Sequence, residues 1–247
     1  MRKALLGATA IAALFGTSAL AADMAVKAPP PPPTSLSNWT GCYIGGNVGG
    51  GWTNFSAIGA RVPTFDWGDQ HNSSVVGGVQ GGCDDQLNKW VVGIKGQFAF
   101  TNLDGQNVVP SAPTFLLSSH IRGIGMATGR IGYLFSPNVL LYAQGGGAWM
   151  RQKFDVNGTV PFPFLSETAT SNRSGYVVGA GVEYEMASNW SVFVEYNYMG
   201  FGTKTVPFVT APGAVGTPNI ISATENVQEA VVGINWRFNL NTPFAAK

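Results

Sequence analysis

The residues best able to do chemistry in this chain are few and scattered. Its two histidines, His71 and His120, have no spacing typical of a zinc site. The nearest approach to a serine hydrolase arrangement is His120 with Ser118, Ser119 and Asp104, a set that no nucleophile motif surrounds. The glycine runs lack the sequence of a phosphate-binding loop. The sequence therefore predicts a protein without metal or cofactor that is not an enzyme; a lipid-modifying enzyme is the remaining catalytic alternative.

The composition excludes further classes. Only 11% of the residues are charged, against about 25% in typical globular domains, so part of the surface meets something other than water. The 33 glycines and the 12% of aromatic residues favour close-packed strands over helices. The 14 Lys and Arg barely exceed the 13 Asp and Glu, so the chain lacks the excess of positive charge that a nucleic-acid partner requires, and no such partner is expected.

The N-terminus carries an export signal. Arg2 and Lys3 precede an apolar run, and Ala19-Leu20-Ala21 is a small-x-small cleavage pattern, so residues 1–21 are predicted to be a signal peptide. Residues 22–38 contain Pro29 to Pro33 and are predicted to form an extended periplasmic tether. No later stretch has about 18 uninterrupted apolar residues. We therefore expect an exported protein without a spanning helix.

From Trp39 onward the hydrophobic pattern has a period of two, which is typical of strands with two unlike faces. In the segment 190–198, for example, every even residue is large and apolar or aromatic, whereas Glu195 and Asn197 lie on the other face. The pattern predicts eight strands, at about 40–52, 74–83, 90–100, 120–134, 139–150, 176–184, 190–198 and 229–238.

The connections between these strands alternate in length. Three are short turns, at 84–88, 136–138 and 186–189, and four are long polar loops, at about 53–73, 101–119, 151–173 and 201–225. This alternation is typical of an all-β, eight-stranded antiparallel up-and-down transmembrane β-barrel over residues 39–238, with short periplasmic turns and long extracellular loops. A soluble eight-stranded calyx of the lipocalin type has the same topology.

The placement of the charges favours the membrane barrel. All charged residues within the strands fall on the face opposite the apolar one, which predicts a lumen ion-pair network of Lys95, Arg122, Arg130, Glu183, Glu185, Glu195, Glu229 and Arg237. The interior of an eight-stranded barrel is just wide enough for side chains to fill it. We therefore expect Glu183, Glu195 and Glu229 to pair with Lys95, Arg130 and Arg237 and close the pore; a narrow porin-like channel is the alternative.

Aromatic residues gather at both ends of the apolar faces, as they do at the two interfaces of a membrane. The girdle toward the short turns comprises Trp90, Tyr133, Tyr184, Trp190, Trp236 and Phe238. The girdle toward the long loops comprises Trp52, Phe98, Phe100, Trp149, Tyr176, Tyr196 and Tyr198.

The two cysteines, Cys42 and Cys83, lie at the short-turn ends of two adjacent antiparallel strands, with the same parity as the lipid-facing residues. In the oxidising periplasm such a pair is predicted to form a disulfide. Two unpaired thiols that act as small apolar side chains are the alternative.

Several blocks resemble those of the outer-membrane immunogenic proteins, which are small porin-like β-barrels akin to the OmpA membrane domain. These blocks are Trp39 to Gly45, Val76 to Gly82, Arg130 to Tyr133, Gly179 to Tyr184 and Val232 to Phe238, in the family order. The chain departs from the family in having Cys42 and Cys83 where glycine and an aromatic residue are common. It also continues past Phe238 in a tail, residues 239–247. The resemblance implies that Gly233, Trp236 and Phe238 form an assembly signal read by the barrel-assembly machinery.

Together these features predict a structural protein of the Gram-negative outer membrane that supports envelope integrity and acts as a surface antigen. Its expected partners are outer-membrane lipid and lipopolysaccharide, the barrel-assembly machinery, and host or surface ligands that contact the loops.

Overall fold

The computed structural model describes residues 38–60, 66–158, 166–210 and 220–238. These residues belong to one compact unit, 36–247. The predicted signal peptide (1–21), the tether (22–38) except its last residue, and the tail (239–247) lie outside the described residues. No helix in the described part of the chain is long and apolar enough to cross a membrane.

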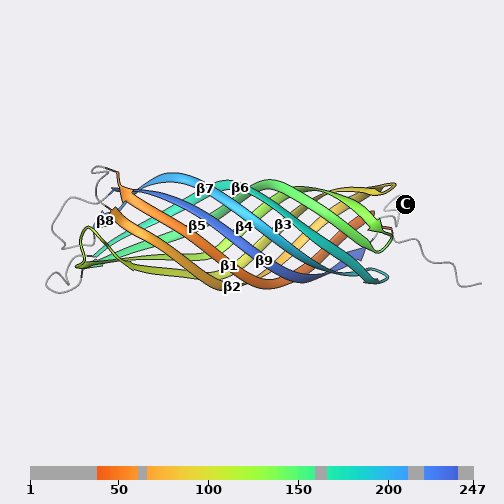
Figure 1. Ribbon diagram of the computed structural model, residues 1–247, viewed down its shortest axis with the longest axis horizontal. Helices are drawn as coiled ribbons and strands as arrows, with labels where there is room; N and C mark the ends of the chain where they lie inside the picture. The colour runs from red at the N-terminus through yellow and green to blue at the C-terminus, as the bar shows by residue number, and fades with distance from the viewer. Residues whose placement is uncertain (1–37, 61–65, 159–165, 211–219, 239–247) are drawn as a thin grey trace, which may run out of the picture. The chain divides into compact units, whose positions relative to one another are not determined.

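Eight long antiparallel strands form a closed barrel, as the sequence predicted (Figure 1). The strands are β1 (Gly41–Gly59), β2 (Asp66–Leu87), β3 (Trp90–Val108), β4 (Phe115–Ser136), β5 (Val139–Gly158), β6 (Ser166–Ala187), β7 (Trp190–Pro207) and β9 (Ile220–Phe238). A two-residue strand, β8 (Val209–Thr210), pairs with β6. Each long strand pairs with the next along the chain, and β1 pairs with β9 to close the ring, so the sheet leaves no long edge unpaired.

The three short turns lie together at one end of the barrel, which we call the turn end; the opposite end is the loop end. Asn88 and Asn189 have φ angles of 58° and 76° in the turns after β2 and β6. Asparagine adopts this left-handed conformation more readily than most residues, which lets these strands reverse direction in a tight turn. The predicted short turns at 136–138 and 186–189 are confirmed, whereas β2 continues to Leu87 and shortens the first turn.

The predicted bounds of the four long loops are mostly wrong, because the strands continue well past their predicted ends at this end of the barrel. In β1, Phe55 and Ala57 are buried whereas Asn54 and Ser56 are exposed. The alternation is therefore still present but inverted: apolar side chains point inward and polar ones outward. This inversion marks the part of the wall that meets water on its outside.

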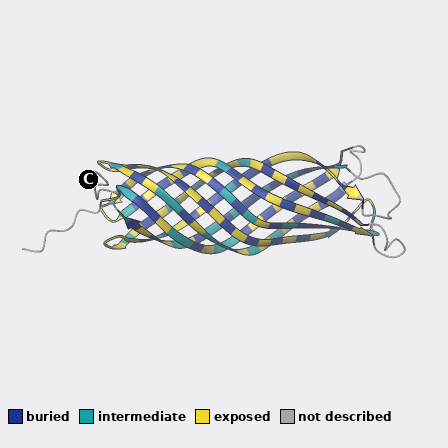
Figure 2. Ribbon diagram, turned by 180° about the vertical axis from the view of Figure 1, so that it is seen from behind, coloured by how far each residue is buried: buried dark blue, intermediate teal, exposed yellow. Residues whose placement is uncertain are grey.

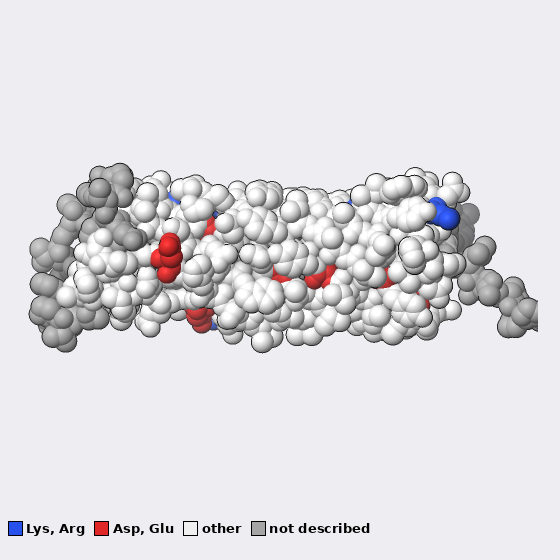
Figure 3. Space-filling model, viewed as in Figure 1, with Lys and Arg blue, Asp and Glu red and all other residues white. Residues whose placement is uncertain are grey.

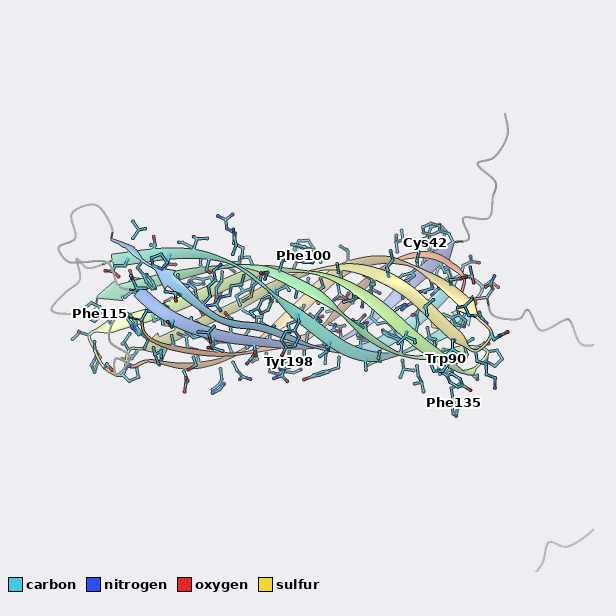
Figure 4. All side chains as sticks on the ribbon, turned by 90° about the horizontal axis from the view of Figure 1, so that it is seen from above. Cys42, Trp90, Phe100, Phe115, Phe135 and Tyr198 are labelled. Atoms are coloured by element: carbon cyan, nitrogen blue, oxygen red, sulfur yellow. A yellow bond between two sulfur atoms is a disulfide. The ribbon has the colours of Figure 1, made fainter. Side chains whose placement is uncertain are left out.

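Buried and exposed residues alternate along the strands over the length of the barrel (Figure 2), but the exposed residues change from apolar to polar toward the loop end. From Trp90 to Phe100 the outward side chains of β3 are apolar or glycine, over the 9–11 residues that a tilted strand needs to cross a bilayer. Phe100 and Tyr198 lie about midway along the barrel, Trp90 and Phe135 lie toward the turn end, and Phe115 lies toward the loop end (Figure 4). The barrel thus continues far beyond the outer aromatic girdle.

Candidate functional site

A cluster of four buried charges lies in the lumen near the turn end. Arg130 of β4 donates from Nε to Asp84 Oδ1 at 2.7 Å and from Nη1 to Glu183 Oε2 at 3.0 Å. Arg237 of β9 donates to Asp84 Oδ2 at 2.8 Å, and its Nη2 lies 3.6 Å from Glu183 Oε1. Two bases and two acids from four strands therefore balance one another, which is the condition under which buried charges are tolerated. We call these residues the charge cluster.

Aromatic side chains hold the charge cluster in place. The ring of Tyr43 lies under both guanidinium groups, 4.8 Å from Arg130 and 5.2 Å from Arg237. At Gly82 a Cβ would lie 2.6 Å from the Tyr43 hydroxyl oxygen, so glycine is needed there to admit this ring.

Trp39, which precedes β1, fills the mouth of the barrel at the turn end. It is 2% exposed and packs with Val91, Leu134 and Leu140. Its indole Nε1 donates to the Pro137 carbonyl oxygen at 3.0 Å. The residue at the start of the first sequence block is therefore packed inside the barrel at the turn end.

A second polar network lies in the middle of the lumen. Lys95 Nζ lies 2.6 Å from Glu195 Oε2, which also accepts a hydrogen bond from the Tyr142 hydroxyl at 2.7 Å. Asn197 Nδ2 donates to Glu195 at 2.7 Å and to Glu229 at 2.9 Å. Lys95 and Glu195 are thus both buried and mutually paired.

Toward the loop end, two apolar layers fill the lumen. Between them lie buried polar side chains: on β5, Met150 belongs to the first layer, Gln152 to the polar level and Phe154 to the second layer. The first layer comprises Val76, Ala99, Leu103, Ile121, Ile124, Met126, Ala148, Met150, Val177, Met199, Phe201 and Val227. The second comprises Phe55, Ala57, Trp67, Val109, Leu117, Phe154, Val156, Ala169, Val206, Phe208, Ile221 and Ala223. Apolar side chains that exclude water oppose the passage of ions.

The structure corrects the predicted placement or pairing of three lumen residues and adds a fourth that was not predicted there. Arg122 lies outside the barrel with its side chain 62% exposed, because β4 bulges between Ile121 and Ile124 and reverses the inward parity. Glu185 is half-buried at the turn end and belongs to no ion pair among the described residues. Glu229 contacts the amides of Gln97 and Asn197, not a base. Asp84, which the sequence placed in a turn, accepts hydrogen bonds from both arginines and is the second acid of the charge cluster beside Glu183.

The predicted aromatic girdles lie on the outside of the wall. Eleven of their members are among the exposed large hydrophobic residues: Trp52, Trp90, Phe98, Phe100, Tyr133, Trp149, Tyr176, Tyr184, Trp190, Tyr196 and Trp236. The other two, Tyr198 and Phe238, are half-buried. Most of the face seen in Figure 3 carries no charged side chain, in keeping with contact with lipid.

Cys42 and Cys83 face each other directly across β1 and β2 and are joined by a disulfide in the structure. The bond crosses the outer surface of the wall toward the turn end, where Cys42 is also opposite Phe238 of β9. It links residues 41 positions apart.

The residues of the predicted assembly signal also have packing roles. The rings of Trp236 and Phe238 lie 5.4 Å apart on β9. A Cβ on Gly233 would lie 2.5 Å from the Phe193 ring, so only glycine leaves room for this buried side chain. Recognition by the assembly machinery stays a prediction.

The predicted hydrolase-like set does not form a triad. His120 Nδ1 lies 2.8 Å from Asp104 Oδ1 on the outside of the wall. Ser119 points into the lumen and donates to Gln70 Oε1 at 3.0 Å, and the Ser118 hydroxyl accepts from Gln106 at 3.5 Å. Within the described ranges, no group of three His, Cys, Asp or Glu side chains is placed to hold a metal ion.

Comparison with known proteins agrees with this architecture. A family model described as "Outer membrane protein beta-barrel domain" matches residues 8–238. The 31 kDa outer-membrane immunogenic protein of Brucella melitensis is 29% identical over 242 residues, covering 92% of this chain and 97% of that protein. The 25 kDa outer-membrane immunogenic protein of Brucella abortus is 26% identical over 234 residues, covering 91% and 92%. The crystal structure of the outer membrane protein OprG from Pseudomonas aeruginosa superposes with a TM-score of 0.56 at 12% identity, covering 83% of this chain and 99% of that one.

Proposed function

Because this chain belongs to the outer-membrane protein β-barrel domain family and lies in the outer membrane, we propose that it is a sealed, non-catalytic barrel. In this proposal it supports the envelope mechanically and presents its loop end at the cell surface as an antigen. The filled lumen carries the proposal. The charge cluster, the network around Lys95 and two apolar layers follow one another along the axis, each built from several strands.

Sealing also supports a structural role because it stiffens the wall. Arg130 and Glu183 come from β4 and β6, which do not pair with each other, and Lys95 and Glu195 come from β3 and β7 on opposite sides of the ring. These ion pairs connect strands that form no backbone hydrogen bonds with each other.

Conductance across planar bilayers tests the seal. Folded wild-type protein is expected to give no frequent, stable conductance steps, because the apolar layers exclude water from the lumen. Co-flotation of labelled protein with vesicles of the same lipid verifies that the protein inserts. Large and reproducible steps from inserted wild-type protein would support the narrow porin-like channel instead.

The orientation of the barrel makes a second prediction. We place the loop end outside the cell, where it can meet host or surface ligands, and the turn end in the periplasm. An epitope tag after Gly158, at the loop end of β5, is expected to be labelled on intact cells, whereas a tag at Ser188, between β6 and β7, is expected to be labelled only after the outer membrane is permeabilised. The reverse pattern would overturn this orientation.

A further inference from the structure

Three basic side chains gather on the outside of the wall just beyond the outer aromatic girdle. Arg122 projects from β4, and Arg151 and Lys153 project from β5; all three are exposed. The described part of the chain has six other Lys and Arg. Lys95, Arg130, Arg173 and Arg237 are buried, Lys89 lies in a turn at the turn end, and Lys204 is exposed on β7. Three of the five exposed basic side chains in the described part of the chain thus lie on two neighbouring strands.

The three basic residues border a groove of about 1140 Å³ in the outer wall. Gly123 and Gly125 line its floor, and Phe98, Phe100 and Trp149 line it toward the membrane. A Cβ on Gly125 would meet its nearest neighbour, the Phe98 ring, only at 3.9 Å, so the groove is open in front of this glycine. The groove therefore has an apolar surface on the side toward the membrane and positive charge on the side toward the loop end.

Acidic residues in the groove reduce its positive charge but do not cancel it. Asp104 Oδ1 lies 3.6 Å from Arg122 Nη2, and Asp155 Oδ1 lies 3.1 Å from Lys153 Nζ. Arg151 takes part in no ion pair with the acids that the structure describes. The two acids thus pair with Arg122 and Lys153, which leaves the Arg151 guanidinium, among the described residues, to bind an anion.

The depth of the groove identifies the kind of molecule that reaches it. Trp149 belongs to the outer girdle, and Arg151 lies two residues further toward the loop end on the same face of β5. Girdle aromatics sit at the level of lipid headgroups, so Arg151 lies at the level of headgroup phosphates. Guanidinium groups bind phosphate with paired, charge-assisted hydrogen bonds.

We propose that this groove binds one molecule of the bisphosphorylated, multiply acylated glycolipid of the outer leaflet, the lipid A portion of lipopolysaccharide. Its phosphates contact Arg122, Arg151 and Lys153, and one acyl chain lies over Gly125 beside the rings of Phe98 and Trp149. The inference rests on the orientation proposed above, which places the loop end outside the cell.

Native mass spectrometry of the folded barrel in detergent, titrated with bisphosphorylated lipid A, tests the site. The variant R122Q/R151Q/K153Q is expected to bind about a hundredfold more weakly than wild type, since each basic residue near an anionic lipid surface contributes about a fivefold factor. K89Q, which removes an exposed charge at the turn end, is the matched control and is expected to bind like wild type. Equal affinities of the triple variant and K89Q would overturn the proposal.

Two further measurements separate lipid recognition from simple charge attraction. G125W should fill the groove without disturbing the wall and is expected to weaken lipid A binding at least about tenfold while leaving all three bases in place. Phosphatidylglycerol and inorganic pyrophosphate are expected not to displace lipid A. Displacement by pyrophosphate would show a bare anion site, and displacement by phosphatidylglycerol would show a generic lipid surface; either result overturns the proposal.

The fold of each variant is checked by its heat-dependent gel mobility. If the triple variant fails to fold, R151Q alone decides the question, because Arg151 makes no ion pair with any residue that the structure describes. Failure of lipid binding leaves the sealed-lumen proposal intact, since the groove is outside the wall and bilayer conductance depends on the lumen. If the tag at Ser188 and not the tag after Gly158 were labelled on intact cells, the proposed orientation would be wrong, and the lipid site, which depends on it, would be wrong as well.

Discussion

Replacing Glu183 by glutamine is expected to lower the free energy of unfolding by about 3–5 kcal/mol, because the change leaves two buried guanidinium groups with a single acid. Glu183 is 0% exposed. Its carboxylate accepts hydrogen bonds from Arg130, from Ser191 at 2.6 Å and from Asn235 at 2.9 Å. Glutamine keeps the size of the side chain but removes the charge. Unfolding by guanidinium chloride in detergent, followed by tryptophan fluorescence, measures the loss.

The chain supplies a matched control for this prediction two residues away. Glu185 lies on the same strand, is half-buried at the turn end, and has no ion pair among the residues that the structure describes. E185Q is therefore expected to change the free energy of unfolding by less than about 1 kcal/mol. The double variant E183Q/R237Q is expected to recover part of the loss, because it restores the charge balance with Arg130 and Asp84. A small, equal effect of E183Q and E185Q would contradict the role assigned to the charge cluster.

Removing the disulfide is expected to destabilise the barrel by up to about 4 kcal/mol, since the bond closes a long loop in the unfolded chain. Cys42 and Cys83 are directly opposite in register, so the folded wall accommodates the bond without a change of pairing. The variant C42S/C83S should keep the barrel fold while unfolding at a lower concentration of denaturant. Wild-type protein taken from the outer membrane and denatured without reductant should show no reactive thiols.

Two controls accompany the disulfide experiment. Wild-type protein with reductant should approach the stability of C42S/C83S, whereas the variant itself should not respond to reductant. A non-reducing gel should show no dimer, which separates a bond within the chain from one between chains. Two reactive thiols per unreduced wild-type chain would show that the cysteines are free in the cell.

The lipid-facing half of this protein could be read from the sequence. In β7, Val194 and Tyr196 alternate with Glu195 and Asn197. This pattern shows which side chains face lipid, because a polar side chain that faced the lipid without a hydrogen-bond partner would cost free energy. The nearness of Cys42 and Cys83 also followed from the sequence, because one lies at the start of the first strand and the other at the end of the second, so antiparallel pairing of these strands brings both to the turn end on the same face.

The contents of the lumen and the length of the wall needed the tertiary structure. Alternation shows that a residue points inward, but not which of the seven other strands it meets. The closed ring decides that Lys95 pairs with Glu195 and that the arginines pair with Asp84 and not with Glu229. The bulge at Arg122 changed the parity within one strand, which no constant period can represent. Beyond the outer girdle the strands continue, but their outer face meets water and not lipid, so the alternation is inverted. The pattern of apolar outer residues ends there, and the sequence therefore predicted loops in place of these strand ends. The sequence thus determined the two faces of the wall in the membrane, and the folded ring decided which side chains meet inside it and how far it extends.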